Sequence, residues 1–144
     1  MGFHPITLPD SALRHVIHVS AIPVSAGFPS PATDHLEDEI DPIAWAVPRP
    51  GSTFWWRVEG DCLIDRGIHD GDLIAVDRDS RKRVGQIVLA VIDGEIVAKV
   101  LGKDRTGYWL EPANRRGGYS RMPFTESTEV WGVVVCVIRK YDAP

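Results

Sequence analysis

The chain has 144 residues, of which 44% are hydrophobic and 25% charged, so it is long enough for one domain with a real core and too short for two ordinary domains. Its formal net charge of -4 argues against a broad basic surface for phosphate backbones and confines any nucleic-acid contact to a partner or to a local patch such as Arg78, Arg81, Lys82 and Arg83. No apolar run approaches the roughly 20 residues of a membrane-spanning helix, the N-terminus lacks a signal pattern, and two cysteines make no disulfide framework, so we expect a cytoplasmic protein.

The first 22 residues show little periodic pattern and are interrupted by prolines, which indicates a mobile arm. Ala12, Val16 and Val19 could form the apolar edge of one short helix, because they recur at spacings of three and four residues. A segment of this length is too short for a helix-turn-helix domain. The sequence therefore predicts no direct sequence-specific DNA binding.

Residues 22–32 read I-P-V-S-A-G-F-P-S-P-A and are rich in proline and small side chains. Proline favours extended backbone, and the small side chains of Ala26 and Gly27 leave the peptide bond between them sterically open. An extended segment can bind as an added strand beside a groove, which is how proteases commonly hold a substrate. The same composition is also typical of a plain linker between the arm and the body.

Residues 34–40, D-H-L-E-D-E-I, are acidic and carry two aliphatic side chains four positions apart. This spacing predicts one or two helical turns that begin with Thr33 or Asp34 as N-cap and end at Asp41-Pro42. We expect these turns to present a solvated acidic face without a chemical role.

From residue 53 onward, short runs of β-branched and aromatic residues alternate with turn residues, which is typical of a β protein. Asp93-Gly94 is the clearest hairpin signal. Because long helical patterns are missing from this half of the sequence, we predict a mainly antiparallel β-fold with short helical turns. The expected strands span residues 53–58, 73–76, 86–92, 95–101, 107–110 and 130–138.

Residues 58–77 read V-E-G-D-C-L-I-D-R-G-I-H-D-G-D-L-I-A-V-D and place Cys62 between a Gly-Asp pair and an Asp-Gly turn. A side chain on such a bend stands clear of the sheet, so the Cys62 thiol is a candidate nucleophile if a nearby group takes its proton. The candidate base is Lys99, which lies in an apolar run, G-E-I-V-A-K-V-L. Apolar neighbours draw an amine out of water, and desolvation disfavours its charged form.

These motifs resemble those of the LexA-type Ser-Lys self-cleaving peptidase family (peptidase S24), and within it the UmuD-like members. The family has its serine in a G-D-S-M-like turn, which corresponds to residues 60–63, followed by an I-x-D-G-D-L-type segment, which corresponds to residues 68–73. Its lysine follows a D-G-E-type turn, matched by residues 93–95 and Lys99. The chain departs from the family at the nucleophile position, where Cys62 stands in place of serine.

The family also has a small-Gly cleavage site near its N-terminus, and Ala26-Gly27 matches that site. The resemblance therefore extends over about residues 22–140. It implies that residues 1–26 form an arm removed by autocleavage and that residues 27–144 form a peptidase-like, dimer-forming body.

The resemblance further implies a mechanism and a set of partners. Cys62 would attack the Ala26 carbonyl, Lys99 would act as the base, and the backbone N–H groups of Asp61 and Cys62 would stabilise the oxyanion. In the family, RecA filaments on single-stranded DNA stimulate cleavage during the SOS response. The shortened protein forms a homodimer and serves as accessory subunit of an error-prone Y-family polymerase of the UmuC type, with no metal or cofactor.

Cysteine in place of serine at position 62 leads to two candidate functions. A thiol ionises more readily than a hydroxyl, which favours an active self-processing peptidase. Sulfur is also larger, so a pocket built for serine can misplace the attack, and a thiolate beside an ammonium can settle as an ion pair. The alternative is therefore a non-cleaving binding module of the same fold that dimerises and regulates the polymerase or RecA. A processing peptidase of the signal-peptidase type shares the chemistry, but the sequence shows no membrane anchor.

Two other kinds of site are possible near the same turn. His69 could pair with Cys62, but it lies seven residues further along the same turn region and no third group orients it. The aspartates at positions 65, 70, 72, 77 and 79 do not match the ligand spacing of a calcium loop, and turn formation and solvation account for them.

The remaining distinctive side chains predict structural roles. Cys136 is expected to be a buried strand thiol because it lies in the run G-V-V-V-C-V-I. Trp55, Trp56 and Trp131 are expected in the core or in an interface, since no basic residues interleave them for base stacking. Residues 129–138 are nearly all apolar, which predicts a strand covered on both faces and favours a dimer.

Overall fold

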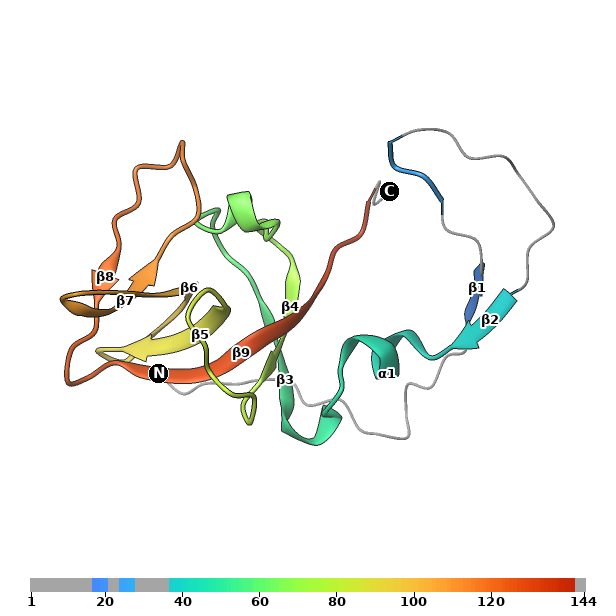
Figure 1. The fold of residues 1–144 in the computed structure, drawn as a ribbon, viewed down its shortest axis with the longest axis horizontal. Coiled ribbons are helices and arrows are strands. Elements are labelled where there is room, and N and C mark those ends of the chain that lie inside the picture. Colours follow the sequence, from blue (N-terminus) through green and yellow to red (C-terminus); the bar gives the residue numbers. More distant parts are fainter. Residues whose placement is uncertain (1–16, 21–23, 28–36, 142–144) are drawn as a thin grey trace.

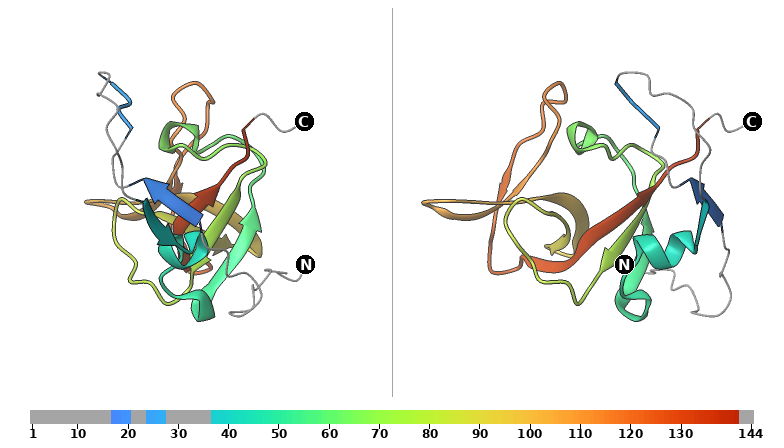
Figure 2. Two further views of the ribbon diagram at one scale, coloured as in Figure 1. Left: turned by 90° about the vertical axis from the view of Figure 1, so that its right-hand side faces the viewer. Right: turned by 45° about the vertical axis from the view of Figure 1, so that its right-hand side comes forward.

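A computed structural model of the chain describes residues 17–20, 24–27 and 37–141. Its main element is a seven-stranded antiparallel sheet in the order β3-β4-β9-β5-β6-β7-β8, and a separate two-stranded sheet joins β1 and β2. Figures 1 and 2 show the β1–β2 sheet and α1 at one end of the molecule and the β6–β7 hairpin at the other. The strands are β1 (Ile17–Ser20), β2 (Glu37–Ile40), β3 (Thr53–Arg57), β4 (Leu73–Asp77), β5 (Ile87–Ile92), β6 (Glu95–Asp104), β7 (Gly107–Glu111), β8 (Met122–Pro123) and β9 (Glu129–Ile138).

The predicted mainly antiparallel β-fold is confirmed, and each expected strand forms with small shifts at its ends. The largest shift is in β6, which continues to Asp104 because its last residues pair with β7. β8 was not predicted, since its two residues are too few to show an alternating pattern.

The two-residue turn Asp93-Gly94 joins β5 to β6, as its sequence predicts. Both residues have positive φ, +49° at Asp93 and +79° at Gly94, which is the backbone of a type I′ hairpin turn. This turn fixes the register of the two strands, in which Lys99 lies opposite Val88.

β9 is an interior strand of the main sheet and lies between β4 and β5 (Figure 1). This interior place explains its apolar run, and Trp131 and Val133 are buried as predicted. Cys136, expected to be buried, is only half-buried. The reason is that β9 pairs with β5 only up to Val133, so its last residues have one neighbouring strand, β4.

Residues 37–40 form a strand, so the predicted helical turn over this segment is wrong. β2 pairs with β1 in antiparallel register, with Ile17 opposite Ile40. Val19 lies in β1, which also overturns the predicted helical edge at that position, while Ala12 and Val16 lie outside the described residues. Segments this short form too few helical hydrogen bonds to hold a helix alone, and pairing with a distant segment decides their conformation.

A short helix, α1 (Pro42–Ala46), begins where the predicted helical turn was expected to end. Asp41 is its N-cap, since the Asp41 carboxylate accepts hydrogen bonds from the N–H groups of Ile43 and Ala44 at 3.0 and 3.2 Å. Proline at the first helical position needs no N–H partner and favours this start. No helix among the described residues has the length and apolar character needed to cross a membrane.

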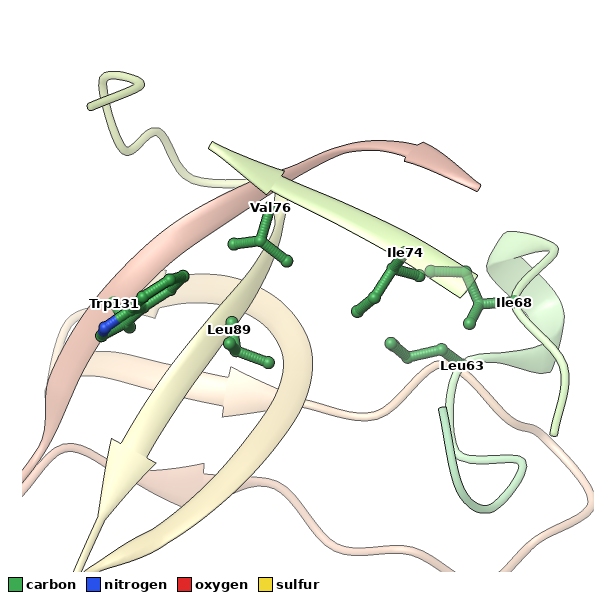
Figure 3. Packing of buried hydrophobic residues seen from close by; sticks show 6 residues of the cluster. All are labelled: Leu63, Ile68, Ile74, Val76, Leu89 and Trp131. Atoms are coloured by element: carbon green, nitrogen blue, oxygen red, sulfur yellow. The ribbon is translucent and has the colours of Figure 1, made fainter. Parts of the chain in front are cut away.

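The core contains the aromatic residues that the sequence placed there. Trp131 is 8% exposed and packs edge-on against the rings of Phe54 and Trp56, with centroid distances of 5.3 and 5.6 Å. Trp55 is buried on the other side of β3, against a smaller cluster. Figure 3 shows the main cluster, which contains Leu63, Ile68, Ile74, Val76, Leu89 and Trp131.

One buried ion pair links the end of β9 to the turn that precedes β4. Arg139 donates to both carboxylate oxygens of Asp72, with its Nε at 2.7 Å and its Nη2 at 2.8 Å, and the Asp72 side chain is 1% exposed. A hydrogen bond from the His69 N–H, at 2.7 Å, satisfies the same carboxylate. The bonds from Arg139 hold the pKa of Asp72 below its ordinary value of 3.8.

We expect Arg139→Ala to lower the free energy of unfolding by about 3 kcal/mol, because it leaves the Asp72 carboxylate buried without its cation. Urea unfolding at neutral pH measures this loss. Arg121→Ala is the matched control, since it breaks the pair with the exposed Asp104 and should lower the free energy of unfolding clearly less than Arg139→Ala does.

The stability from this pair should also depend on pH. A carboxyl group whose pKa is lowered on folding contributes stability above its unfolded value, and this contribution is lost as the pH falls through the folded value. The difference between the wild type and Arg139→Ala should therefore narrow below pH 3.8. A difference that stays constant on acidification would show that Asp72 and Arg139 are not coupled.

Candidate active site

Cys62 lies on a tight turn between β3 and the 3-10 helix η2 (Ile64–Arg66). The turn contains Gly60, whose φ of +91° favours glycine. The Gly60 N–H donates to the Asp70 carboxylate at 2.7 Å, so the Asp-Gly-Asp segment folds back onto the nucleophile turn. Val58 adds two backbone hydrogen bonds of 2.8 and 2.9 Å to the residues that follow Asp70.

Leu63, the residue after Cys62, anchors the turn in the core. It is 2% exposed and points toward Ile74 of β4 in Figure 3. Cys62 itself is half-buried, so its thiol lies at the boundary between the core and the solvent. The bend therefore presents Cys62 to a cleft, but the side chain still packs against the core cluster and does not stand clear of the sheet as expected.

Lys99 is buried on β6, where only 9% of the residue is exposed. Directly opposite it on β5 is Val88, which is fully buried. Within the described part of the chain, no carboxylate lies within ion-pair distance of the Lys99 amine. The residue as a whole is therefore largely removed from solvent, as its apolar neighbours predict, while it also lines a cleft.

Cys62 and Lys99 line the same cleft, which has a volume of about 420 Å³. The thiol donates a hydrogen bond to the Ala98 carbonyl, with Sγ and O 3.6 Å apart, and no hydrogen bond joins it to the Lys99 amine. The structure thus brings the two predicted residues together without direct pairing. Besides these residues the cleft is lined by Trp56, Arg57, Val58, Glu59, Gly60, Asp61, Leu63, Ile74, Leu89, Ile96, Val97 and Tyr119.

One wall of the cleft is the first half of β6, which among the described residues has a strand neighbour on one side only. β6 pairs with β5 over residues 95–100, but its pairing with β7 begins at Val100. In an antiparallel pair that starts at a two-residue turn, backbone groups of alternate residues point away from the partner strand. Ala98 is such a residue, and its carbonyl faces Cys62.

The predicted oxyanion donors are the backbone N–H groups of Asp61 and Cys62. Neither the Asp61 N–H nor the Cys62 N–H donates to an acceptor in the described residues, whereas the preceding Gly60 N–H is occupied by Asp70. The carbonyl of Asp61 accepts a hydrogen bond from Asn114 Nδ2 at 2.8 Å. Because the peptide unit is planar and trans, this bond fixes the direction of the Cys62 N–H.

Sequence reasoning missed the loop between β7 and β8, which packs on the nucleophile turn and is here called the 112–121 loop. Ala113 N–H donates to the Cys62 carbonyl at 2.7 Å, and the Ala113 carbonyl accepts from Asp65 N–H at 2.8 Å. The Asp65 carboxylate in turn accepts from Arg115 N–H at 2.8 Å. The only signal in this stretch is its polar, glycine-rich composition, which indicates a loop but not what the loop contacts.

Tyr119 on the 112–121 loop contacts both sides of the cleft. Its hydroxyl donates a short hydrogen bond to the Asp61 carboxylate. Its ring lies over the Lys99 amine, with the centroid 5.3 Å from Nζ. The hydrogen bond to Asp61 raises the pKa of the Tyr119 phenol above its ordinary value, because the carboxylate stabilises the protonated form.

His69 and the aspartates near the turn, considered above as alternative sites, make structural hydrogen bonds. His69 is not among the residues that line the cleft, and its N–H donates to the Asp72 carboxylate. Asp70 and Asp65 hold backbone N–H groups of the turn and of the 112–121 loop. No three His, Cys, Asp or Glu side chains gather as a possible metal site in the part of the chain that the structure describes.

Ala26 and Gly27 are exposed, which agrees with an accessible peptide bond. The Gly27 N–H donates to Ser25 Oγ at 3.3 Å. In Figure 1 residues 24–27 lie apart from the η2 turn, and they do not line the cleft that holds Cys62. In this structure the predicted cleavage site therefore lies outside the cleft.

Comparison with known proteins matches residues 18–135 to the Peptidase S24-like family model. The chain is 40% identical over 116 residues to Protein ImpA of Salmonella typhimurium, covering 80% of this chain and 78% of that protein. It is 36% identical over 122 residues to Protein MucA of Escherichia coli, covering 77% and 76%. It is also 34% identical over 116 residues to the LexA repressor of Alcanivorax borkumensis, covering 81% of this chain and 56% of the repressor.

We expect iodoacetamide to modify Cys62 about tenfold faster than Cys136, because the thiolate is the reactive form and access governs its rate. Cys62 lines an open cleft, whereas burial raises the pKa of the Cys136 thiol. Peptide mass spectrometry after short exposure measures both rates. The single-cysteine variants Cys62→Ser and Cys136→Ser serve as controls, and equal rates in the folded protein would contradict the described cleft.

Proposed function

The chain belongs to the Peptidase S24-like family, and we propose that it is a self-processing protein that cuts its own Ala26-Gly27 bond. Cys62 is the nucleophile and Lys99 is the general base. The observation that carries the proposal is that these two residues, 37 positions apart in the sequence, line one cleft in which the lysine is buried. Removal of residues 1–26 leaves the body, residues 27–144.

The substrate segment binds as an added strand along the free edge of β6. This edge offers the backbone groups of Ala98 beside the Cys62 thiol. A bound strand takes the Ala98 carbonyl as its acceptor, which frees the thiol to rotate toward Lys99. Because catalytic hydrogen bonds often form only in the substrate complex, the missing thiol–amine bond is compatible with this order of events.

Residues 24–27 reach the cleft either within one molecule or from a second copy. Gly27 lies 35 positions before Cys62, and at roughly 3.3 Å per extended residue this separation in the sequence does not by itself select one route over the other. The exposure of Ala26 and Gly27 supports access in both cases.

The reaction follows from the positions of these groups. The neutral Lys99 amine takes the thiol proton as Sγ attacks the Ala26 carbonyl, and the N–H groups of Asp61 and Cys62 stabilise the oxyanion that forms. The carbon–nitrogen bond then breaks while the Lys99 ammonium returns its proton to the Gly27 amine. Water, deprotonated by Lys99, hydrolyses the remaining thioester at Ala26 and restores the thiol.

The processed body acts on a polymerase partner. By its resemblance to the UmuD-like members of the family, we infer that the protein works in the cytoplasm during the SOS response. RecA filaments on single-stranded DNA stimulate its cleavage, and the product is an accessory subunit of an error-prone Y-family polymerase. The identity to Protein ImpA and Protein MucA over more than three quarters of the chain supports this place within the family.

A second candidate is a non-cleaving binding module of the same fold. The observation that favours it is the Cys62 thiol itself, which replaces the family's serine and donates to Ala98 rather than to Lys99. In this case the protein regulates its polymerase or RecA partner by binding to it, without cleavage. Cleavage assays separate the two candidates.

Purified full-length protein incubated at alkaline pH, which favours the unprotonated amine, should release a fragment of residues 27–144. Lys99→Ala and Cys62→Ala should each abolish this fragment, because each removes a member of the dyad. Intact-mass spectrometry identifies the new N-terminus at Gly27. Cys136→Ser is the matched control, since that thiol lies outside the cleft, and should cleave at the wild-type rate. An intact chain under all conditions, including with RecA filaments, would favour the binding module.

Cys62→Ser should cleave at least as fast as the wild type, because it restores the smaller nucleophile for which the family's cleft is shaped. The rate constants come from the same mass-spectrometric time course. Loss of cleavage in this variant, with an active wild type, would show instead that this cleft depends on a thiol.

We also propose a homodimer, in line with the family. The apolar run of β9 no longer supports it alone, because the interior position of β9 accounts for much of that run. Support comes from the exposed apolar side chains at its end, Ile138 and Tyr141, which are 39% and 82% exposed.

Sedimentation velocity at micromolar concentration should show a dimer, and Ile138→Asp should shift it toward monomer by placing a charge in the interface. Val84→Asp is the control, since Val84 is an exposed apolar residue in the loop between β4 and β5. A wild-type protein that sediments only as a monomer would remove this proposal.

A further inference from the structure

We propose that Tyr119 is a positioning residue for cleavage, which holds the nucleophile turn and the base in their working arrangement from the 112–121 loop. This inference rests on the proposed autocleavage. Tyr119 lines the cleft together with Cys62 and Lys99 and comes from a loop that neither residue belongs to. Tyr119 therefore links the turn that carries Cys62 to the strand that carries Lys99.

The hydroxyl of Tyr119 holds Asp61, the residue that precedes the nucleophile Cys62. It donates to the Asp61 carboxylate, while Asn114 on the same loop donates to the Asp61 carbonyl at 2.8 Å. The side chain and the backbone of Asp61 are thus both held by one loop. Since the N–H of Cys62 belongs to the same planar peptide unit as that carbonyl, the loop sets the direction of a proposed oxyanion donor.

The hydrogen bond from Tyr119 also sets the direction in which the negatively charged Asp61 side chain points. The Asp61 carboxylate is exposed and belongs to the residue before the nucleophile, close to the N–H groups proposed to bind the Ala26 oxyanion. A carboxylate that turned toward the oxyanion would oppose that charge. Its hydrogen bond to Tyr119 holds it on the side of the 112–121 loop.

The ring of Tyr119 acts on the base. Its centroid lies 5.3 Å from Lys99 Nζ, so the face of the ring is turned to the amine. An aromatic face attracts a cation, so it stabilises the ammonium that forms when Lys99 takes the thiol proton. The ring does so without the full charge of a carboxylate, which would keep the amine protonated.

The cleavage rate tests the two parts of Tyr119 separately. Tyr119→Phe keeps the ring and removes the bond to Asp61, and we expect cleavage to slow by about three- to tenfold. Tyr119→Leu removes the ring as well, and a further fall of about two- to fivefold is expected. Combining Tyr119→Phe with Asp61→Ala should slow cleavage no more than the slower single variant, because both changes break one bond.

Tyr108→Phe is the matched control. Tyr108 is 45% exposed and its ring lies 4.9 Å from Lys103 Nζ, so it repeats the exposure and the ring–lysine contact outside the cleft. This variant should cleave at the wild-type rate. Thermal unfolding of all variants identifies any effect that comes from lost stability alone.

A measurement that needs no cleavage tests the contact itself. The phenol of Tyr119, followed by NMR and identified by its absence in Tyr119→Phe, should lose its proton at higher pH than an ordinary tyrosine. Asp61→Asn should lower that midpoint, because it removes the negative charge that disfavours ionisation of the phenol. A midpoint unchanged by Asp61→Asn would overturn the inference.

The outcomes separate this inference from the proposed function. If the wild type cleaves and Tyr119→Phe cleaves equally fast, the inference is wrong and the proposed function stands. If neither the wild type nor Cys62→Ser cleaves under any condition, the proposed function fails and the inference falls with it. A slowed Tyr119→Phe of unchanged stability, with an unaffected Tyr108→Phe, supports both.

Discussion

A buried carboxylate needs partners, and the partners of Asp72 hold the candidate active site in place. Arg139 at the end of β9 donates to both of its oxygens, and the His69 N–H donates to one of them. The backbone carbonyl of Asp72 accepts the N–H of Val58, just after β3. One residue thus ties together three separate segments. The turn that carries Cys62 lies between two of these segments. Its position therefore follows largely from the contacts that the buried Asp72 makes.

Sequence patterns predicted what depends on local chemistry. The strands follow from β-branched runs, the β5–β6 hairpin from Asp93-Gly94, and the shared cleft from the motifs around Cys62 and Lys99. The predictions failed where distant segments meet. Residues 37–40 suit a helix by composition, yet they pair with β1, and the 112–121 loop has no periodicity that could reveal its contacts with the nucleophile turn.

The hydrogen bond from the Cys62 thiol to Ala98 gives one backbone carbonyl two uses. In the structure it accepts from the thiol, and in the proposed complex it accepts from the substrate strand. The two donors compete for the same atom. In that proposed complex, binding of the cleavage segment would replace a weak sulfur donor with a backbone N–H, and this replacement would release the nucleophile. The edge of β6 that accepts the resting thiol is thus the edge on which we propose that the substrate binds.

The order of strands in the main sheet has a consequence for the timing of maturation. β9, the last strand in the chain, separates the β3–β4 pair beside Cys62 from the β5–β6 pair that carries Lys99. A ribosome-bound chain that has not yet released β9 lacks the element that joins these halves, and it also lacks Arg139. In the proposed route within one molecule, the two halves of the site would therefore come together only after β9 has joined the sheet, so a chain could cut itself only once this strand has been synthesised.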